Sequence, residues 1–232
     1  MSFARRGFAG RRSGALALLG AALIFAGRSA ALAQTAPPAA EGDRLAERAH
    51  QDRTIVYFLR PPESHAFDLY HDYTESRPGV DRYLNVVRKG SAASGPSARD
   101  LDTGETLRVE TLSGDAVLKG GGAPGEDVQP DSEVVIAHFA PVRPGTSIRL
   151  RIAETYTDPK SYRLEGDELV FDRSFGRPRN AVVLPAGWYL TASSIPALVT
   201  ETPDRRIRLD FVNPRNDDIA VLIKARRRPG GG

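Results

Sequence analysis

The hydrophobic pattern of the chain changes at Asp52. From there on, apolar or aromatic residues alternate with polar ones in short runs, and turn residues separate the runs. The runs span residues 54–59, 65–73, 81–87, 105–112, 133–139, 147–156, 162–172, 180–184, 188–192, 206–212 and 219–225. No segment carries a helical stripe long enough for a core helix. The pattern predicts an all-β fold, namely an antiparallel β-sandwich of about 10–11 short strands with little helix.

Proline and glycine mark the predicted turns. Arg-Pro-Gly stands between strands at residues 77–79 and 143–145 and recurs at 228–230. Proline fixes φ at the second position of a type II turn, and glycine accepts the positive φ of the third. The sequence EGDE at 165–168 predicts a four-residue hairpin, and PAG at 185–187 predicts a tight connection into the next strand.

The same pattern predicts the domain organisation. We expect a flexible tether over residues 34–51, one β-sandwich domain over 52–226 and a disordered tail over 227–232. The longest break between strands, residues 119–132, is interpreted as a surface loop of one domain. Two packed sub-domains divided at this break are the alternative.

The first 33 residues have the features of a signal peptide. A basic start is followed by an apolar run at 14–27 and by the small residues of 31–33, which predicts cleavage between Ala33 and Gln34. The run is shorter than the roughly 20 apolar residues of a membrane-spanning helix, so we expect no transmembrane segment after cleavage. Paired arginines at 11–12 leave twin-arginine export open beside general secretion. The expected location is the bacterial periplasm or the medium.

Removal of the signal peptide changes the charge balance. The whole chain has 32 basic and 29 acidic residues. Five arginines and no acid lie within residues 1–33, so the mature chain carries 27 basic and 29 acidic residues. A slightly acidic chain does not predict nucleic-acid binding. The chain has no cysteine, which excludes a lipid anchor on cysteine, thiol catalysis, a thiolate metal site and disulfides.

Three arginines near the only tryptophan form the first candidate site. Arg173, Arg177 and Arg179 lie beside the turn that leads to Trp188. Guanidinium groups suit carboxylate or phosphate, and an aromatic ring beside them could stack on a ligand. The competing interpretation places Trp188 in the core and the arginines in a solvated loop, because the residues after Trp188 alternate as in a half-buried strand.

Histidines and an acid form a second candidate, with metal or acid–base chemistry. On an extended strand His65 and His71 share a face, but six residues at about 3.3 Å each separate them by roughly 20 Å. Only a bulge or a third element carrying His138 would complete a site with one of them and Asp72. The competing interpretation is two histidines at the rim of an apolar face. We therefore assign no metal site, no cofactor and no catalytic residue.

Other catalytic motifs are absent or have a simpler explanation. Asp102-Thr103-Gly104 matches the aspartic protease triplet, but it follows a polar segment, and a turn between strands accounts for it. No Gly-x-Ser-x-Gly elbow, His-Glu-x-x-His helix, phosphate loop or dinucleotide motif occurs. These absences weaken the case for an enzyme.

Two segments resemble known families. The runs AVVLPAGWYLTASSIPA (181–197) and RIRLDFVNPRNDDIAVLIKARR (206–227) resemble β-sandwich modules of bacterial envelope proteins. PPESHAFDLYHDY (61–73) is similar to the first strands of the non-catalytic β-domain that precedes secreted zinc aminopeptidases. Neither resemblance identifies a characterised family or implies a catalytic residue here.

Together these features predict a non-catalytic binding or envelope-assembly module. Its partner would be an envelope protein or a glycan, engaged at a sheet edge or through the loops at 173–180 and 120–131. The alternative is an accessory domain or hydrolase acting on peptide or glycan through His65, His71 and Asp72. The sequence carries no signal for the oligomeric state.

Overall fold

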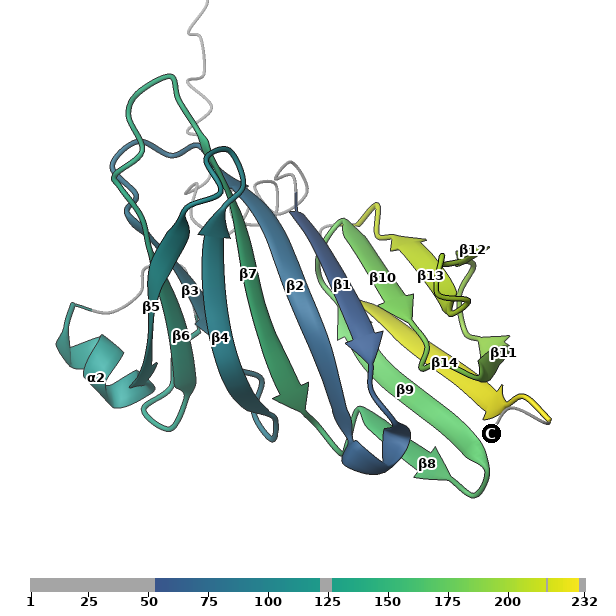
Figure 1. Ribbon diagram of the computed structural model, residues 1–232. Coiled ribbons are helices and arrows are strands. Elements are labelled where there is room, and N and C mark those ends of the chain that lie inside the picture. Colours follow the sequence, from purple (N-terminus) through teal and green to yellow (C-terminus); the bar gives the residue numbers. More distant parts are fainter. Residues whose placement is uncertain (1–52, 122–126, 216, 230–232) are drawn as a thin grey trace, which may run out of the picture. The chain divides into compact units, whose positions relative to one another are not determined.

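The computed structural model describes residues 53–121, 127–215 and 217–229, all of which belong to the unit Pro38–Gly232 (Figure 1). The predicted signal peptide, the tether at 34–51 and the last three residues lie outside the described residues. The described chain is mostly β-strand, as predicted. No helix within the described ranges is long and apolar enough to cross a membrane.

The strands follow one another along the chain, and most of the connections are short. The first seven are β1 (Arg53–Leu59), β2 (Ala66–Glu75), β3 (Arg82–Val86), β4 (Ala92–Asp100), β5 (Thr106–Ser113), β6 (Glu133–His138) and β7 (Ile148–Thr157). The next seven are β8 (Tyr162–Glu165), β9 (Glu168–Phe175), β10 (Arg179–Val183), β11 (Trp188–Ser193), β12 (Leu198–Glu201), β13 (Ile207–Val212) and β14 (Ile219–Arg227). Two short helices interrupt them, the 3₁₀ helix η1 (Pro62–Ser64) and α2 (Gly114–Lys119).

The strands form two sheets. The larger has the order β12-β13-β10-β1-β2-β7-β4-β5-β6-β3, and the smaller has the order β11-β14-β9-β8 (Figure 1). The expectation of purely antiparallel pairing is wrong for the larger sheet, because β1 pairs with β10 in parallel. A hairpin forces antiparallel pairing only on consecutive strands, and β1 and β10 are far apart in the sequence.

The main core lies where the two sheets meet. Most of its buried side chains come from β1, β2, β10 and β13 of the larger sheet and from β9, β14, β11 and β8 of the smaller one. Aromatic rings bridge the sheets: Tyr57 stacks on Phe175 at 5.4 Å, and Phe67 meets Phe171 edge-on at 5.6 Å. Trp188 is 3% exposed and belongs to this core, which confirms its interpretation as a core residue.

Beyond this core the larger sheet curls, so that its last strand lies against the face that carries the core residues; we call this face the inward face. Tyr83 and Asn85 of β3, the last strand of the sheet, hydrogen-bond with side chains of β2 and β7. A second apolar cluster, which includes Tyr73 and Leu150, fills part of the space between these strands. The inward faces of β1, β2 and β7 are therefore covered by β3 in one part and by the smaller sheet in another.

A buried ion pair joins β9 to the loop that follows β7. Arg173 donates from Nη1 to Oδ2 of Asp158 at 2.9 Å, and both side chains are less than 9% exposed. The guanidinium also lies over the ring of Phe67 at 5.2 Å. Asp158 accepts further hydrogen bonds from the Ser161 backbone N–H and the Ser91 hydroxyl. Arg173 was expected in a surface loop; it lies in β9 and points into the core instead.

Elements without a clear hydrophobic period were missed. β4 (AASGPSARD) has few apolar residues, and its Gly95-Pro96 pair falls in a bulge between Ser94 and Ser97. It is nevertheless a strand, because β7 pairs with it along most of its length. The helix α2 begins at the cap Ser113, whose hydroxyl accepts from the Ala116 N–H. The flanking strands β5 and β6 pair directly with each other.

The two Arg-Pro-Gly turns between strands occur as expected, whereas the hairpin at 165–168 is tighter than predicted, because Glu165 and Glu168 are themselves paired strand residues. Gly79 and Gly145 have φ values of 84° and 76°, as the third position of a type II turn requires. Thr146 donates its backbone N–H to the Arg143 carbonyl at 3.0 Å, which closes the second turn. The connection at 185–187 is tight, but it leads from β10 in the larger sheet to β11 in the smaller one rather than forming a hairpin.

The ion pair generates a stability prediction. Asp158→Asn removes one charge and leaves Arg173 buried without a counter-charge, so we expect urea denaturation to show a loss of about 3 kcal/mol in the free energy of unfolding. The same change at Asp204, whose side chain is exposed in its pair with Arg206, should have a much smaller effect. The double variant Asp158→Asn/Arg173→Met should be more stable than Asp158→Asn alone. Equal stability of these two variants would contradict the role of the pair.

Candidate functional site

Two hollows open on the inward face of the larger sheet. The Arg53 pocket has a volume of about 530 Å³ and is lined by residues of β1, β2, β3, β5, β6 and α2. The Glu154 cavity has a volume of about 190 Å³ and is lined mainly by residues of β1, β2, β3 and β7. Tyr83 lines both, so the two hollows are neighbours.

Strand periodicity places the lining residues together. Residues opposite each other in an antiparallel pair share a face, and β2 pairs with β7 so that His71 faces Ile152 and Leu69 faces Glu154. Alternate residues of β2 from Phe67 to Glu75 are buried, while those between them are half-buried. The polar groups of the two hollows thus occupy positions that a regular strand would give to core residues.

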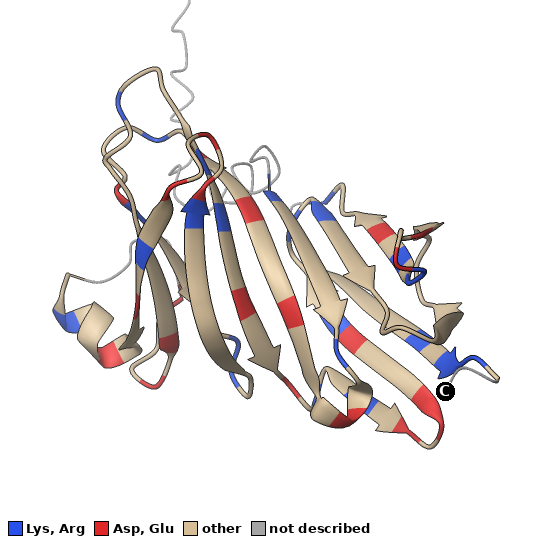
Figure 2. Cartoon of the chain, viewed as in Figure 1, with Lys and Arg blue, Asp and Glu red and all other residues tan. Residues whose placement is uncertain are grey.

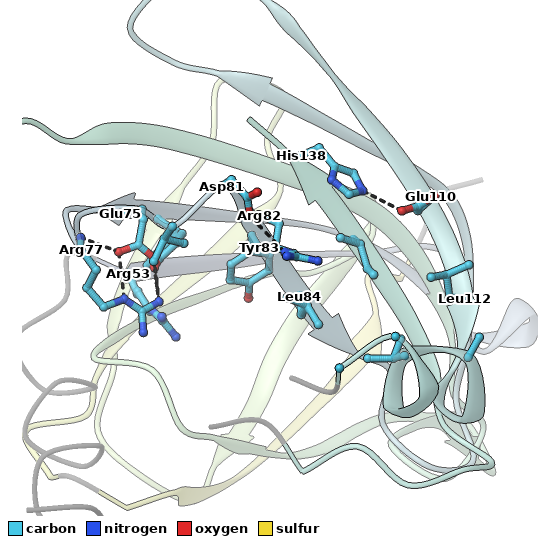
Figure 3. A pocket seen from close by; sticks show the side chains of 17 residues that line it. Arg53, Glu75, Arg77, Asp81, Arg82, Tyr83, Leu84, Glu110, Leu112 and His138 are labelled. Carbon is cyan, nitrogen blue, oxygen red and sulfur yellow. Dashed lines mark hydrogen bonds and ion pairs between the residues drawn. The ribbon is translucent and has the colours of Figure 1, made fainter. Parts of the chain in front are cut away.

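Arg53 is a buried base without an acidic partner. The acids that line the Arg53 pocket each pair with a base: Glu75 with Arg77, Asp81 with Arg82, and Glu110 with His138. No described carboxylate pairs with Arg53, which is 8% exposed, and its Nε has no hydrogen-bond partner. Figure 3 shows Arg53, Glu75 and Arg77 at one end of the pocket and the His138–Glu110 pair at the other.

The Tyr73 ring holds the Arg53 side chain in place, while burial and the nearby Arg177 oppose its positive charge. Its guanidinium lies over the Tyr73 ring at 4.4 Å. Burial lowers the pKa of Arg53, and the positive charge of Arg177 lowers it further. Tyr73 donates its hydroxyl to Glu75, and burial together with this carboxylate raises the pKa of Tyr73 to about 12. A guanidinium in this setting would gain an interaction from an anion that entered the pocket.

Glu154 is a buried acid without a basic partner. Glu154 is 4% exposed. Its Oε1 accepts a hydrogen bond from the Asn85 side-chain amide, and its Oε2 has no hydrogen-bond partner. Burial raises the pKa of Glu154 from 4.5 to about 7; the Asn85 hydrogen bond opposes this shift, and the charge of Glu133 adds to it. The same Asn85 amide donates to the Tyr156 hydroxyl at 2.9 Å, which fixes its orientation.

His71 completes the polar wall of the Glu154 cavity. Its Nδ1 lies 2.8 Å from the Tyr83 hydroxyl, and its Nε2 has no partner. Burial lowers the pKa of His71 well below its usual value, and the charges of Arg177 and Arg53 act in the same direction. The imidazole is therefore neutral at neutral pH.

The residues of the predicted metal or acid–base site lie apart. His65 ends η1 and its Nδ1 is 2.9 Å from the Tyr162 carbonyl oxygen. Asp72 lies on the opposite face of β2 from His71 and pairs with Arg151. His138 lines the Arg53 pocket. Within residues 53–121, 127–215 and 217–229 no three His, Asp or Glu side chains are grouped as metal ligands.

The predicted arginine site is also divided. Arg173 is in the core, Arg177 is half-buried in the connection after β9, and Arg179 begins β10 with an exposed side chain. Trp188 is buried beneath the Arg227 guanidinium, 5.1 Å from it. Of the three arginines, the charge of Arg177 acts on His71 and Arg53. Figure 2 shows bases and acids interspersed along the strands, with bases gathered at the end of β14.

Sequence reasoning missed Arg53, Glu75 and Glu154. The alternation of the strands carried a signal for the two acids. Glu75 continues the inward series of β2 that begins at Phe67, and Glu154 stands between the inward residues Ile152 and Tyr156 of β7. An acid at an inward position of a regular strand indicates a polar group in the core. Arg53 carries no such signal, because it stands at the start of its strand.

Comparisons with known proteins give weak likenesses. No protein-family model and no curated protein matches the chain. A mutant two-domain M1 zinc metallopeptidase bound to L-tryptophan is similar at 16% identity and a TM-score of 0.42, over 74% of this chain and 41% of that one. The M1 zinc metallopeptidase from Deinococcus radiodurans is similar at 15% identity and a TM-score of 0.43, over 75% of this chain and 41% of that one. An aminopeptidase N family protein from Idiomarina loihiensis is similar at 12% identity and a TM-score of 0.41, over 74% of this chain and 29% of that one. This chain spans less than half of each.

Glu154 generates a pH prediction. Because its pKa in the folded chain is raised from 4.5 to about 7, its contribution to stability is present below pH 4.5 and is lost as the pH rises through 7. Glu154→Gln removes this dependence. We expect the free energy of unfolding of Glu154→Gln, relative to the unchanged chain, to increase by about 3 kcal/mol between pH 4.5 and pH 8.5. Urea denaturation at both pH values measures it; parallel pH profiles of the two proteins would contradict it.

Proposed function

We propose that the chain is a non-catalytic binding module, and that the Arg53 pocket takes a small ligand with an apolar body and an anionic group. The observation that carries the proposal is the buried Arg53 guanidinium, which has no acidic partner among the described residues. A buried charge without a counter-charge costs stability, and a bound carboxylate would supply the missing partner.

The rest of the pocket suits such a ligand. Its volume of about 530 Å³ is typical of small-molecule sites. Apolar side chains line it beside the polar groups, among them Leu84, Leu112 and Ile136. The acids in the wall already have basic partners, so they need none from the ligand. The pocket therefore combines an apolar surface with one unmatched positive charge.

The geometry supports the alternative of an accessory domain or hydrolase less well. That alternative needs His65, His71 and Asp72 to act together, and these side chains have three separate sets of partners. The smaller sheet and the shared core support the finer description of the fold as a β-sandwich with one extended sheet.

The proposed setting is the bacterial envelope or the medium, and its support is the sequence of residues 1–33. Expression in a Gram-negative host should yield a mature chain that begins at Gln34 in the periplasmic fraction. Intact-mass measurement of that fraction checks this expectation. Retention of the full-length chain in the cytoplasm would contradict it.

The ligand proposal is tested with hexanoate, which has a carboxylate and a short apolar chain. Isothermal titration should show saturable binding of hexanoate and much weaker binding of hexanamide, which lacks the charge. Arg53→Met should weaken hexanoate binding at least tenfold, because a charged hydrogen bond contributes roughly 1.5–3 kcal/mol. Arg53→Lys should retain part of the affinity.

The matched control is Arg226→Met, an arginine on β14 outside the pocket. It should bind hexanoate as the unchanged chain does. Circular dichroism and thermal unfolding confirm that each variant is folded. Equal affinities of Arg53→Met and the unchanged chain, or no binding by the unchanged chain, would contradict the proposal.

A further inference from the structure

The Glu154 cavity contains two buried polar atoms that no described group satisfies. Oε2 of Glu154 and Nε2 of His71 both lack a hydrogen-bond partner, and both residues line the cavity. Most buried polar atoms in folded proteins are hydrogen-bonded, so two orphaned atoms on one small cavity are unusual. The volume of the cavity, about 190 Å³, is enough for a small chemical group.

The strand register makes Glu154 and His71 neighbours at the cavity. Because Leu69 faces Glu154 and His71 faces Ile152, Glu154 and His71 are diagonal neighbours on the same face of β2 and β7. The Cα atoms of such neighbours are about 7–8 Å apart, so long side chains approach each other between them. Asn85 and Tyr83, both from β3, hold the other atoms of Glu154 and His71.

The unmatched Glu154 carboxylate favours a positively charged hydrogen-bond donor, although the charges of Arg53 and Arg177, which act on His71, oppose a cation. Arg173, which also lines it, is matched by Asp158. Glu154 has no basic partner in the described part of the chain, and its free Oε2 accepts when the acid is ionised. The neutral His71 offers Nε2 as a second acceptor when its Nδ1–H donates to the Tyr83 hydroxyl.

We propose that the Glu154 cavity is a second binding site, which takes a compact primary ammonium group that donates to Oε2 of Glu154 and Nε2 of His71. The site is separate from the Arg53 pocket, although Tyr83 lines both and the charge of Arg53 acts on His71. Its ligand is a cation rather than an anion, because the unmatched residue is an acid in the Glu154 cavity and a base in the Arg53 pocket.

Binding of a cation should be linked to the protonation of Glu154. An ammonium ion favours the ionised carboxylate of Glu154, whose pKa is about 7, so affinity should fall as the pH drops below 7. Three groups interact with Glu154: Asn85 of β3 by a hydrogen bond, Glu133 by its charge, and Tyr156, whose pKa the charge of Glu154 raises. His71 and Arg173 line the same cavity, as does the exposed Arg88, and the charges of Arg53 and Arg177 act on His71.

Methylammonium chloride is the probe, with the full chain as the protein. Its two heavy atoms limit the affinity to the millimolar range. Thermal unfolding at pH 8 should show a saturable rise in Tm with methylammonium and none with tetramethylammonium, which has the same charge but no N–H donor. Acetamide, a neutral N–H donor, separates the two chemistries: a rise in Tm with acetamide alone would overturn the assignment of a cation.

Variants locate the response. Glu154→Gln and His71→Phe should each weaken methylammonium binding at least tenfold, with His71→Phe deciding if Glu154→Gln does not fold. Glu105→Gln makes the same chemical change at an exposed carboxylate and should leave binding unchanged. Hexanoate and methylammonium are titrated separately, so failure of the hexanoate test and failure of this one remain distinguishable. An unaltered response in both cavity variants, or an equal response to tetramethylammonium, overturns the proposal.

Discussion

Alternate side chains of β1, β2 and β7 must all lie on the same face of the larger sheet, and this constraint determines both its core and its hollows. Tyr57 and Phe67 use the face to pack against the smaller sheet. Arg53 lies four residues before Tyr57 on β1, and His71 lies four residues after Phe67 on β2, so both are on the same face and line the two hollows. The packing that orders the strands therefore also orients the polar groups, which need no loop to position them.

The buried charges fall into two kinds. Arg173 and Asp158 satisfy each other and are further fixed by serine donors and aromatic rings, so they stabilise the junction between the sheets. Arg53 and Glu154 are equally buried but are matched by no opposite charge in the described chain. A protein selected only for stability would replace such residues with apolar ones, which makes these two positions informative about binding.

The period of two was sufficient to predict the fold class, most strands and the buried face of β2, because a half-buried strand must alternate. It failed for β4, where the sheet tolerates Gly95-Pro96 in a bulge, and for the parallel pairing of β1 with β10, which depends on distant segments. The structure divides the candidate residues: Arg173 is buried while Arg179 is exposed, and His71 and Asp72 lie on opposite faces of β2. The hollows instead combine residues from separate strands, and a single sequence carries no record of that pairing.

The place of β1 in the larger sheet has a consequence for the order of folding. β1 lies between β2, its neighbour in the chain, and β10, which begins at Arg179. The β1–β2 hairpin can form early, but one edge of β1 stays open until nearly four-fifths of the chain is available. An open edge readily pairs with other chains, so we expect fragments that end before β10 to aggregate rather than fold. Completion of the sheet thus depends on a contact between distant parts of the sequence.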